Sequence, residues 1–117
     1  MDGTIIKLTT PVEAFNRRYT EVTLREPTGA LFLRLGEPRI PVLSGESGGY
    51  YFVEQAPIIN AYLEKLVSVD DNNDIAVTSA VLSQISLADA ARIKEALFRF
   101  FTVAAAQAAA ANPSPKL

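Results

Sequence analysis

Alternating apolar and polar positions mark the beginning of the chain as β-structure. Residues 4–8 are rich in β-branched side chains, and residues 19–25 alternate strictly, which is typical of half-buried strands. Three residues of the second strand are expected to face the core: Thr20, Val22 and Leu24. Because Pro11 and a turn over 15–18 lie between the runs, the pattern predicts an antiparallel hairpin, with its first strand extended past Pro11 as an edge.

A short helix is expected after this hairpin. Pro27 stops the second strand because it cannot donate to the ladder. Thr28 is a good N-cap for a helix over residues 29–35, which Gly36 and Pro38 would end.

Two further apolar runs, residues 40–43 and 50–53, flank a Gly/Ser-rich segment and predict a second, weaker hairpin. The glycine-rich segment, residues 45–49, lacks both the Lys-Ser/Thr sequel and the G-x-G-x-x-G spacing of phosphate-binding loops. We interpret it as a turn.

Helical periodicity governs the second half of the chain. Apolar residues recur at helical spacing over 55–67, with Pro57 in the first turn. They are Ile58, Ile59, Tyr62, Leu63, Leu66 and Val67. A polar break at 70–74 precedes a short helix expected over 78–85, with Val81, Leu82 and Ile85 turned inward.

The last helix has the clearest signals. Ser86 and Asp89 form an S-x-x-D capping pattern, in which serine accepts a backbone N–H and aspartate meets the positive helix end. One face is expected to carry Ile93, Leu97, Phe101 and Ala104. On the opposite face, Glu95 and Arg99 form an i, i+4 pair worth ~0.3 kcal/mol. Alanine dominates residues 103–111. It favours a helix, but its small side chains offer little apolar surface to bury.

These elements predict one α+β domain over residues 1–104: N-terminal antiparallel hairpins followed by a small helical bundle with a long C-terminal helix. Residues 105–117 are expected to form an alanine-rich helical extension and a disordered tail.

Composition narrows the class of protein. Apolar residues make up 49% of the 117 residues, and the chain has 11 basic and 13 acidic side chains. Because there is no clustered basic excess, we do not expect the chain to bind nucleic acid. The start of the chain does not resemble a signal peptide, and no apolar run is long enough to span a bilayer. We therefore expect a cytoplasmic protein.

Candidate chemistry is sparse. The chain has no Cys and no His, which removes thiol nucleophiles, Ser-His-Asp triads and Cys/His zinc sites. The acidic run 70–74 lacks the EF-hand spacing and is interpreted as a solvated loop. We therefore predict no catalytic, cofactor or metal site and a protein that is not an enzyme, although carboxylate pairs alone could support acid–base chemistry.

Two motifs stand out in the chain. The first is Leu24-Arg25-Glu26-Pro27-Thr28-Gly29, followed by Leu35-Gly36-Glu37-Pro38. The second is Ser86-Leu87-Ala88-Asp89, running into an apolar helix that contains Phe100-Phe101. Together they resemble the motifs of the small tail assembly chaperones of long-tailed phages, and the resemblance covers about residues 4–103. The chain departs from the family pattern in its hairpin turn, in apolar Phe32 and Leu33, and in the segment 70–74.

The resemblance implies a non-virion protein that binds the tape measure protein, keeps it soluble and helps recruit tail tube subunits, acting in multiple copies. Some members of the family also have a longer frameshifted product. The alternatives are a structural virion component, such as a tail or connector protein, and a small host regulator that binds proteins.

Partner contacts are expected at Phe32, Leu33 and Phe98. The first two are apolar where the family is usually polar, and Phe98 lies off the stripe of Ile93 and Leu97. Three aromatics within residues 98–101 span too wide an arc for one core-facing stripe, so at least one should lie near the surface.

Overall fold

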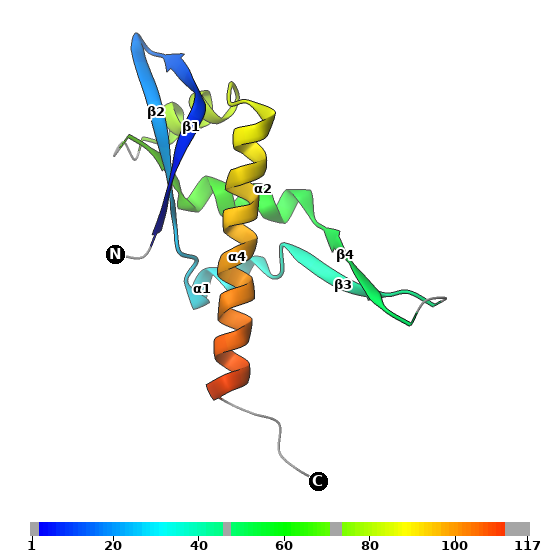
Figure 1. The fold of residues 1–117 in the computed structure, drawn as a ribbon. Helices are drawn as coiled ribbons and strands as arrows, with labels where there is room; N and C mark the ends of the chain where they lie inside the picture. Colours follow the sequence, from blue (N-terminus) through cyan, green and yellow to red (C-terminus); the bar gives the residue numbers. More distant parts are fainter. Residues whose placement is uncertain (1–2, 46–47, 71–73, 112–117) are drawn as a thin grey trace.

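The computed structural model describes residues 3–45, 48–70 and 74–111, and it has an α+β fold (Figure 1). Strand β1 (Gly3–Ala14) and strand β2 (Arg17–Arg25) form the expected N-terminal hairpin. Both residues of its two-residue turn have positive φ, 52° at Phe15 and 60° at Asn16. This is the conformation of a type I′ turn, whose twist matches that of the two strands.

β1 is an edge strand that continues past Pro11, as predicted, but its pairing is interrupted. The register shifts between Lys7 and Val12, so more residues lie on β1 than on β2 there. Beside this shift the inward–outward alternation of β2 also breaks. Tyr19 is buried and Thr20 is exposed, so the expectation that Thr20 faces the core was wrong, whereas Val22 and Leu24 are fully buried as predicted.

Helix α1 (Gly29–Leu35) has the predicted bounds and caps. The Leu31 N–H donates to Thr28 Oγ1 at 3.1 Å, and Gly36, at φ 86°, closes the helix through its N–H to the Phe32 carbonyl. The left-handed conformation at this end favours glycine because it has no Cβ.

Strands β3 (Arg39–Leu43) and β4 (Tyr50–Glu54) form the second expected hairpin as a separate two-stranded sheet. It projects away from the rest of the fold (Figure 1). Within the hairpin the Arg39 guanidinium carbon lies 4.2 Å from the Phe52 ring centroid. An ion pair between Glu54 and Lys94, at 2.9 Å, joins the base of the hairpin to the C-terminal helix.

Helix α2 (Ala56–Leu66) begins with proline in its first turn, as expected, but ends earlier than its periodicity predicted. Val67 begins a third strand, β5 (Val67–Val69), that pairs antiparallel with β2. Assigning Val67 to the helix was therefore wrong. The three-residue strand is completely buried, and the cross-strand pairing available beside β2 outweighs one more helical residue.

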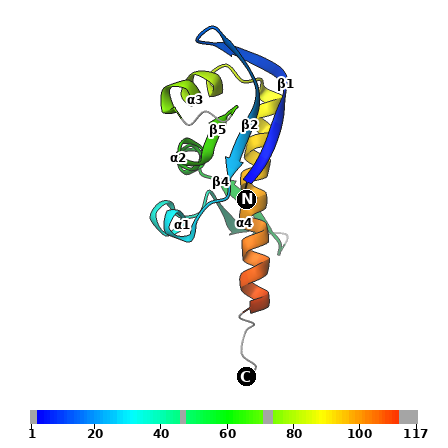
Figure 2. The ribbon, with the colours of Figure 1, turned by 90° about the vertical axis from the view of Figure 1, so that its left-hand side faces the viewer.

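Helix α3 (Ile75–Leu82) starts three residues before the predicted position because Asp74 caps it, accepting the Ala76 N–H at 2.8 Å. Helix α4 (Leu87–Ala111) is the long C-terminal helix. It runs alongside the β1–β2 hairpin and then extends beyond it, while α3 packs near β5 (Figures 1 and 2). The predicted disordered tail, 112–117, lies outside the described residues.

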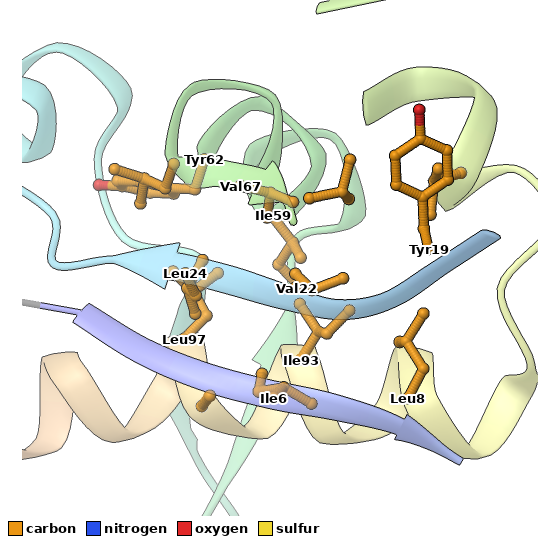
Figure 3. Packing of buried hydrophobic residues seen from close by; sticks show 14 of the residues in the cluster. Ile6, Leu8, Tyr19, Val22, Leu24, Ile59, Tyr62, Val67, Ile93 and Leu97 are labelled. Carbon is orange, nitrogen blue, oxygen red and sulfur yellow. The ribbon is translucent and has the colours of Figure 1, made fainter. Parts of the chain in front are cut away.

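The core lies where β1, β2 and β5 meet the helices (Figure 3). Val22, Leu24 and Val69 from the sheet, Tyr62 from α2, and Leu97 from α4 are all fully buried. The principal extents of the molecule, 62 × 34 × 23 Å, show that it is elongated.

Candidate functional site

An apolar groove separates α1 and the loop before it from the outer part of α4. Its volume is about 400 Å³. The lining residues are Glu26, Pro27, Thr28, Gly29, Phe32, Glu37, Phe100, Phe101, Ala104, Ala105 and Ala108. We call this feature the α1–α4 groove. It brings together residues from both sequence motifs, which lie about seventy positions apart in the chain.

Local structure explains how the groove forms. Pro27 ends β2, Thr28 caps α1, and the short helix turns the chain away from the sheet so that Phe32 faces α4. On the other wall, Phe100 and Phe101 are half-buried at the margin of the core. The alanines that follow are exposed and small, and they keep the groove open.

Aromatic rings form the floor next to the core. Phe101 lies between Phe32, at a centroid distance of 5.8 Å, and Tyr62, at 5.2 Å in an edge-to-face arrangement. The Tyr62 hydroxyl donates to the Gly36 carbonyl at 2.6 Å. Burial raises the pKa of Tyr62, and the negative charge of Glu37 raises it further, so this hydroxyl stays neutral and holds α1 in place.

The rim of the groove is acidic. Glu26 and Glu37 both line it and both are exposed, and none of the described residues that line it is basic. An apolar floor with an acidic rim is suited to an apolar segment that carries Lys or Arg beside its apolar residues.

The three predicted contact residues have different environments. Phe32 is half-buried and lines the groove, whereas Leu33 is 85% exposed and does not line it. The surface placement of Phe98 was wrong, because only 8% of this residue is exposed. Arg39, at the base of the β3–β4 hairpin, covers its ring, with the guanidinium carbon 4.6 Å from the centroid.

Other motif residues have structural roles. Leu24 is a core residue, and the Arg25 guanidinium donates to the Lys65 carbonyl. Pro38 is buried and its carbonyl accepts the Gln55 N–H at 2.8 Å. Leu87, at the start of α4, is 86% exposed.

Ser86 caps α4 as predicted, accepting the Asp89 N–H at 3.2 Å. The Asp89 carboxylate has a second role that the capping motif did not reveal. It is fully buried and accepts hydrogen bonds from the backbone N–H groups of Thr9 and Thr10, 2.9 and 3.3 Å away, and from the Thr9 hydroxyl. These donors belong to the irregular part of β1, so Asp89 joins β1 to α4 by satisfying N–H groups that the β-ladder leaves unpaired.

Asp89 is held in its charged form. Burial alone raises its pKa, but hydrogen bonds with Thr9, Thr10 and Ser86 outweigh burial and lower the pKa from 3.8 to about 2. Arg92 also contacts the carboxylate, at 3.0 Å. Every oxygen of this buried group is used within the fold, so we assign Asp89 to stability rather than to chemistry on a substrate.

The acidic segment 70–74 has fold-related roles at both ends. The Asp70 carboxylate accepts the N–H groups of Thr20 and Glu21, and Asp74 caps α3. Residues 71–73, like residues 46–47 of the glycine-rich segment, lie outside the described part of the chain. Within the described ranges, no three His, Cys, Asp or Glu side chains come together to hold a metal ion.

Comparisons with known protein families, with curated proteins and with solved structures give no match for this chain. None of the helices in the described part of the chain combines the length and apolar character needed to cross a membrane. The α1–α4 groove, where both motifs meet around an aromatic floor, is therefore the leading candidate for a binding site.

Proposed function

We propose that this chain is a non-enzymatic assembly chaperone of a long-tailed phage or prophage, and that it binds the tape measure protein through the α1–α4 groove. It acts in the host cytoplasm, assists assembly of the tail tube and is not retained in the mature virion. The observation that supports the proposal is the convergence of the two family-like motifs on one apolar groove.

The physical role follows from what a tape measure protein presents. A long helical protein with unmatched apolar stripes aggregates unless those stripes are covered. A groove with Phe32, Phe100 and Phe101 on its floor can accept apolar side chains from one face of a helix, as in other helix-in-groove complexes. Its acidic rim, Glu26 and Glu37, favours helices with basic residues next to the apolar stripe.

Co-expression tests the function directly. Together with the tape measure protein from the same genome, this chain is expected to move that partner from the insoluble to the soluble fraction, while purified particles lack the chain. If the partner stays insoluble and the chain is found in finished particles, the chain is instead a structural virion component. If neither effect is seen, a regulator that binds host proteins becomes the better hypothesis.

A further inference from the structure

The β3–β4 hairpin exposes most of its large apolar side chains. Six of them are between 38% and 81% exposed: Ile40, Leu43, Tyr50, Tyr51, Phe52 and Val53. A two-stranded sheet also has two open edges, and proteins normally cover or interrupt such edges to prevent unwanted strand pairing.

The hydrogen bonds at the two ends of the hairpin determine which backbone groups face outward. The Ser44 N–H donates to the Gly49 carbonyl and the Gln55 N–H to the Pro38 carbonyl, both at 2.8 Å. Because bonded and non-bonded pairs alternate in an antiparallel ladder, the pairs Ile40–Val53 and Val42–Tyr51 are the bonded ones between these ends. The backbone groups of the alternate residues therefore point away from the hairpin: Arg39, Pro41 and Leu43 on β3, and Tyr50, Phe52 and Glu54 on β4.

The two edges are consequently unequal. Proline has no backbone N–H, so Pro41 leaves the outer edge of β3 without its central donor. The outer edge of β4 has an N–H and a carbonyl at each of its three outward positions. β4 is thus the edge that can accept another strand.

We propose that β4 pairs antiparallel with β4 of a second copy of this chain, about a two-fold axis at Phe52. In this register each Phe52 lies opposite Phe52 of the second copy, Tyr51 opposite Val53, and Tyr50 opposite Glu54. Aromatic–aromatic and aromatic–β-branched pairs are favourable across strands, and no like charges face each other. A register centred on Glu54 instead places two carboxylates opposite one another.

The pairing uses all five residues of β4 and joins the two hairpins into one four-stranded sheet with closed two-fold symmetry. It buries the β4 edge while leaving the α1–α4 groove, which none of these residues line, free for a partner. The proposal is therefore independent of the chaperone function.

A cysteine cross-link tests the register. The chain has no native cysteine, so each variant has a single thiol. At a bonded antiparallel pair the two Cα atoms are about 5.5 Å apart, within the range that a disulfide spans. Under mild oxidation Phe52→Cys is expected to form a disulfide-linked dimer, whereas the matched control Leu43→Cys, on the β3 edge and 81% exposed, is not. Equal cross-linking of both variants, or of the control alone, would overturn the proposal.

Proline variants test the same edge without a cross-link. Tyr50→Pro removes one outward N–H from each β4. Because the dimer is symmetric, two hydrogen bonds are lost, and the dissociation constant of the dimer should rise about tenfold. Leu43→Pro removes the outward N–H of the residue directly opposite, on β3, and should leave the constant unchanged. Sedimentation measures both, and circular dichroism checks that both fold. A wild type that stays monomeric at every concentration, or equal effects of the two prolines, would contradict the proposal.

Discussion

The two halves of α4 belong to the same helix but are stabilised differently. In residues 87–98, five side chains are buried: Asp89, Ile93, Ala96, Leu97 and Phe98. In residues 99–111 none is buried, and alanine predominates. The first half is helical because it packs, and the second because its residues have high helix propensity.

This difference separates what folds the protein from what is available to a partner. The inner half of α4 meets the sheet (Figure 3). It also carries the buried carboxylate of Asp89. The outer half extends beyond the sheet (Figure 2). It supplies one wall of the α1–α4 groove. Changes in the inner half should therefore act on stability, and changes in the outer half on binding.

Leu97→Ala should have the largest effect on stability. Leu97 is fully buried where α4 packs against the sheet. Removing its side chain leaves a cavity and should lower the free energy of unfolding by about 2 to 4 kcal/mol. Denaturant unfolding measures the loss. Equal stability of wild type and variant would show that the inner half does not pack as described.

Asp89→Asn should cost about 1 to 3 kcal/mol at neutral pH, because the N–H groups of Thr9 and Thr10 lose their charged acceptor. The same group creates a pH dependence. Its pKa is about 2 in the folded protein against 3.8 ordinarily, so the unfolded chain binds more protons in this window. Its contribution is complete above pH 3.8 and is lost as the pH falls through 2.

The difference in unfolding free energy between wild type and Asp89→Asn should therefore shrink as the pH is lowered through this window. Denaturant titrations of both proteins at a series of acidic pH values measure it. A difference independent of pH would mean that the carboxylate is not held in its charged form.

Ala108→Ser should have the smallest effect on stability, within about 0.5 kcal/mol, because Ala108 is exposed in the outer half. Thermal unfolding of Ala108→Ser and Leu97→Ala under the same conditions compares their losses of stability. A loss as large as that of Leu97→Ala would mean that the two halves are not distinct.

Much of the fold could be predicted because its signals are local. The bounds of α1 follow from Thr28, Gly36 and their neighbours, and α4 begins where Ser86 predicts. The features that were missed depend on distant partners. β5 forms because Val67 pairs with Leu24 of β2, and Tyr19 is buried where the alternation of β2 breaks, beside the register shift of β1.

The candidate site shows the same division. The motifs identified residues such as Pro27 and Phe101, but nothing in the sequence shows that they line one groove. Phe98 was misplaced because the residue that covers it, Arg39, comes from a hairpin nearly sixty positions away. The second role of Asp89 was missed for the same reason, since its donors lie eighty residues earlier.

The most direct test of the groove compares two arginine substitutions in the outer half of α4. Ala105 lines the α1–α4 groove, whereas Ala106 is not among its lining residues, and both are exposed. Both variants should fold like the wild type, since neither alanine is packed. On co-expression with the tape measure protein, Ala105→Arg should fill the groove and abolish solubilisation of the partner, and Ala106→Arg should solubilise it as the wild type does. Equal solubilisation by both variants would show that the groove is not the binding site.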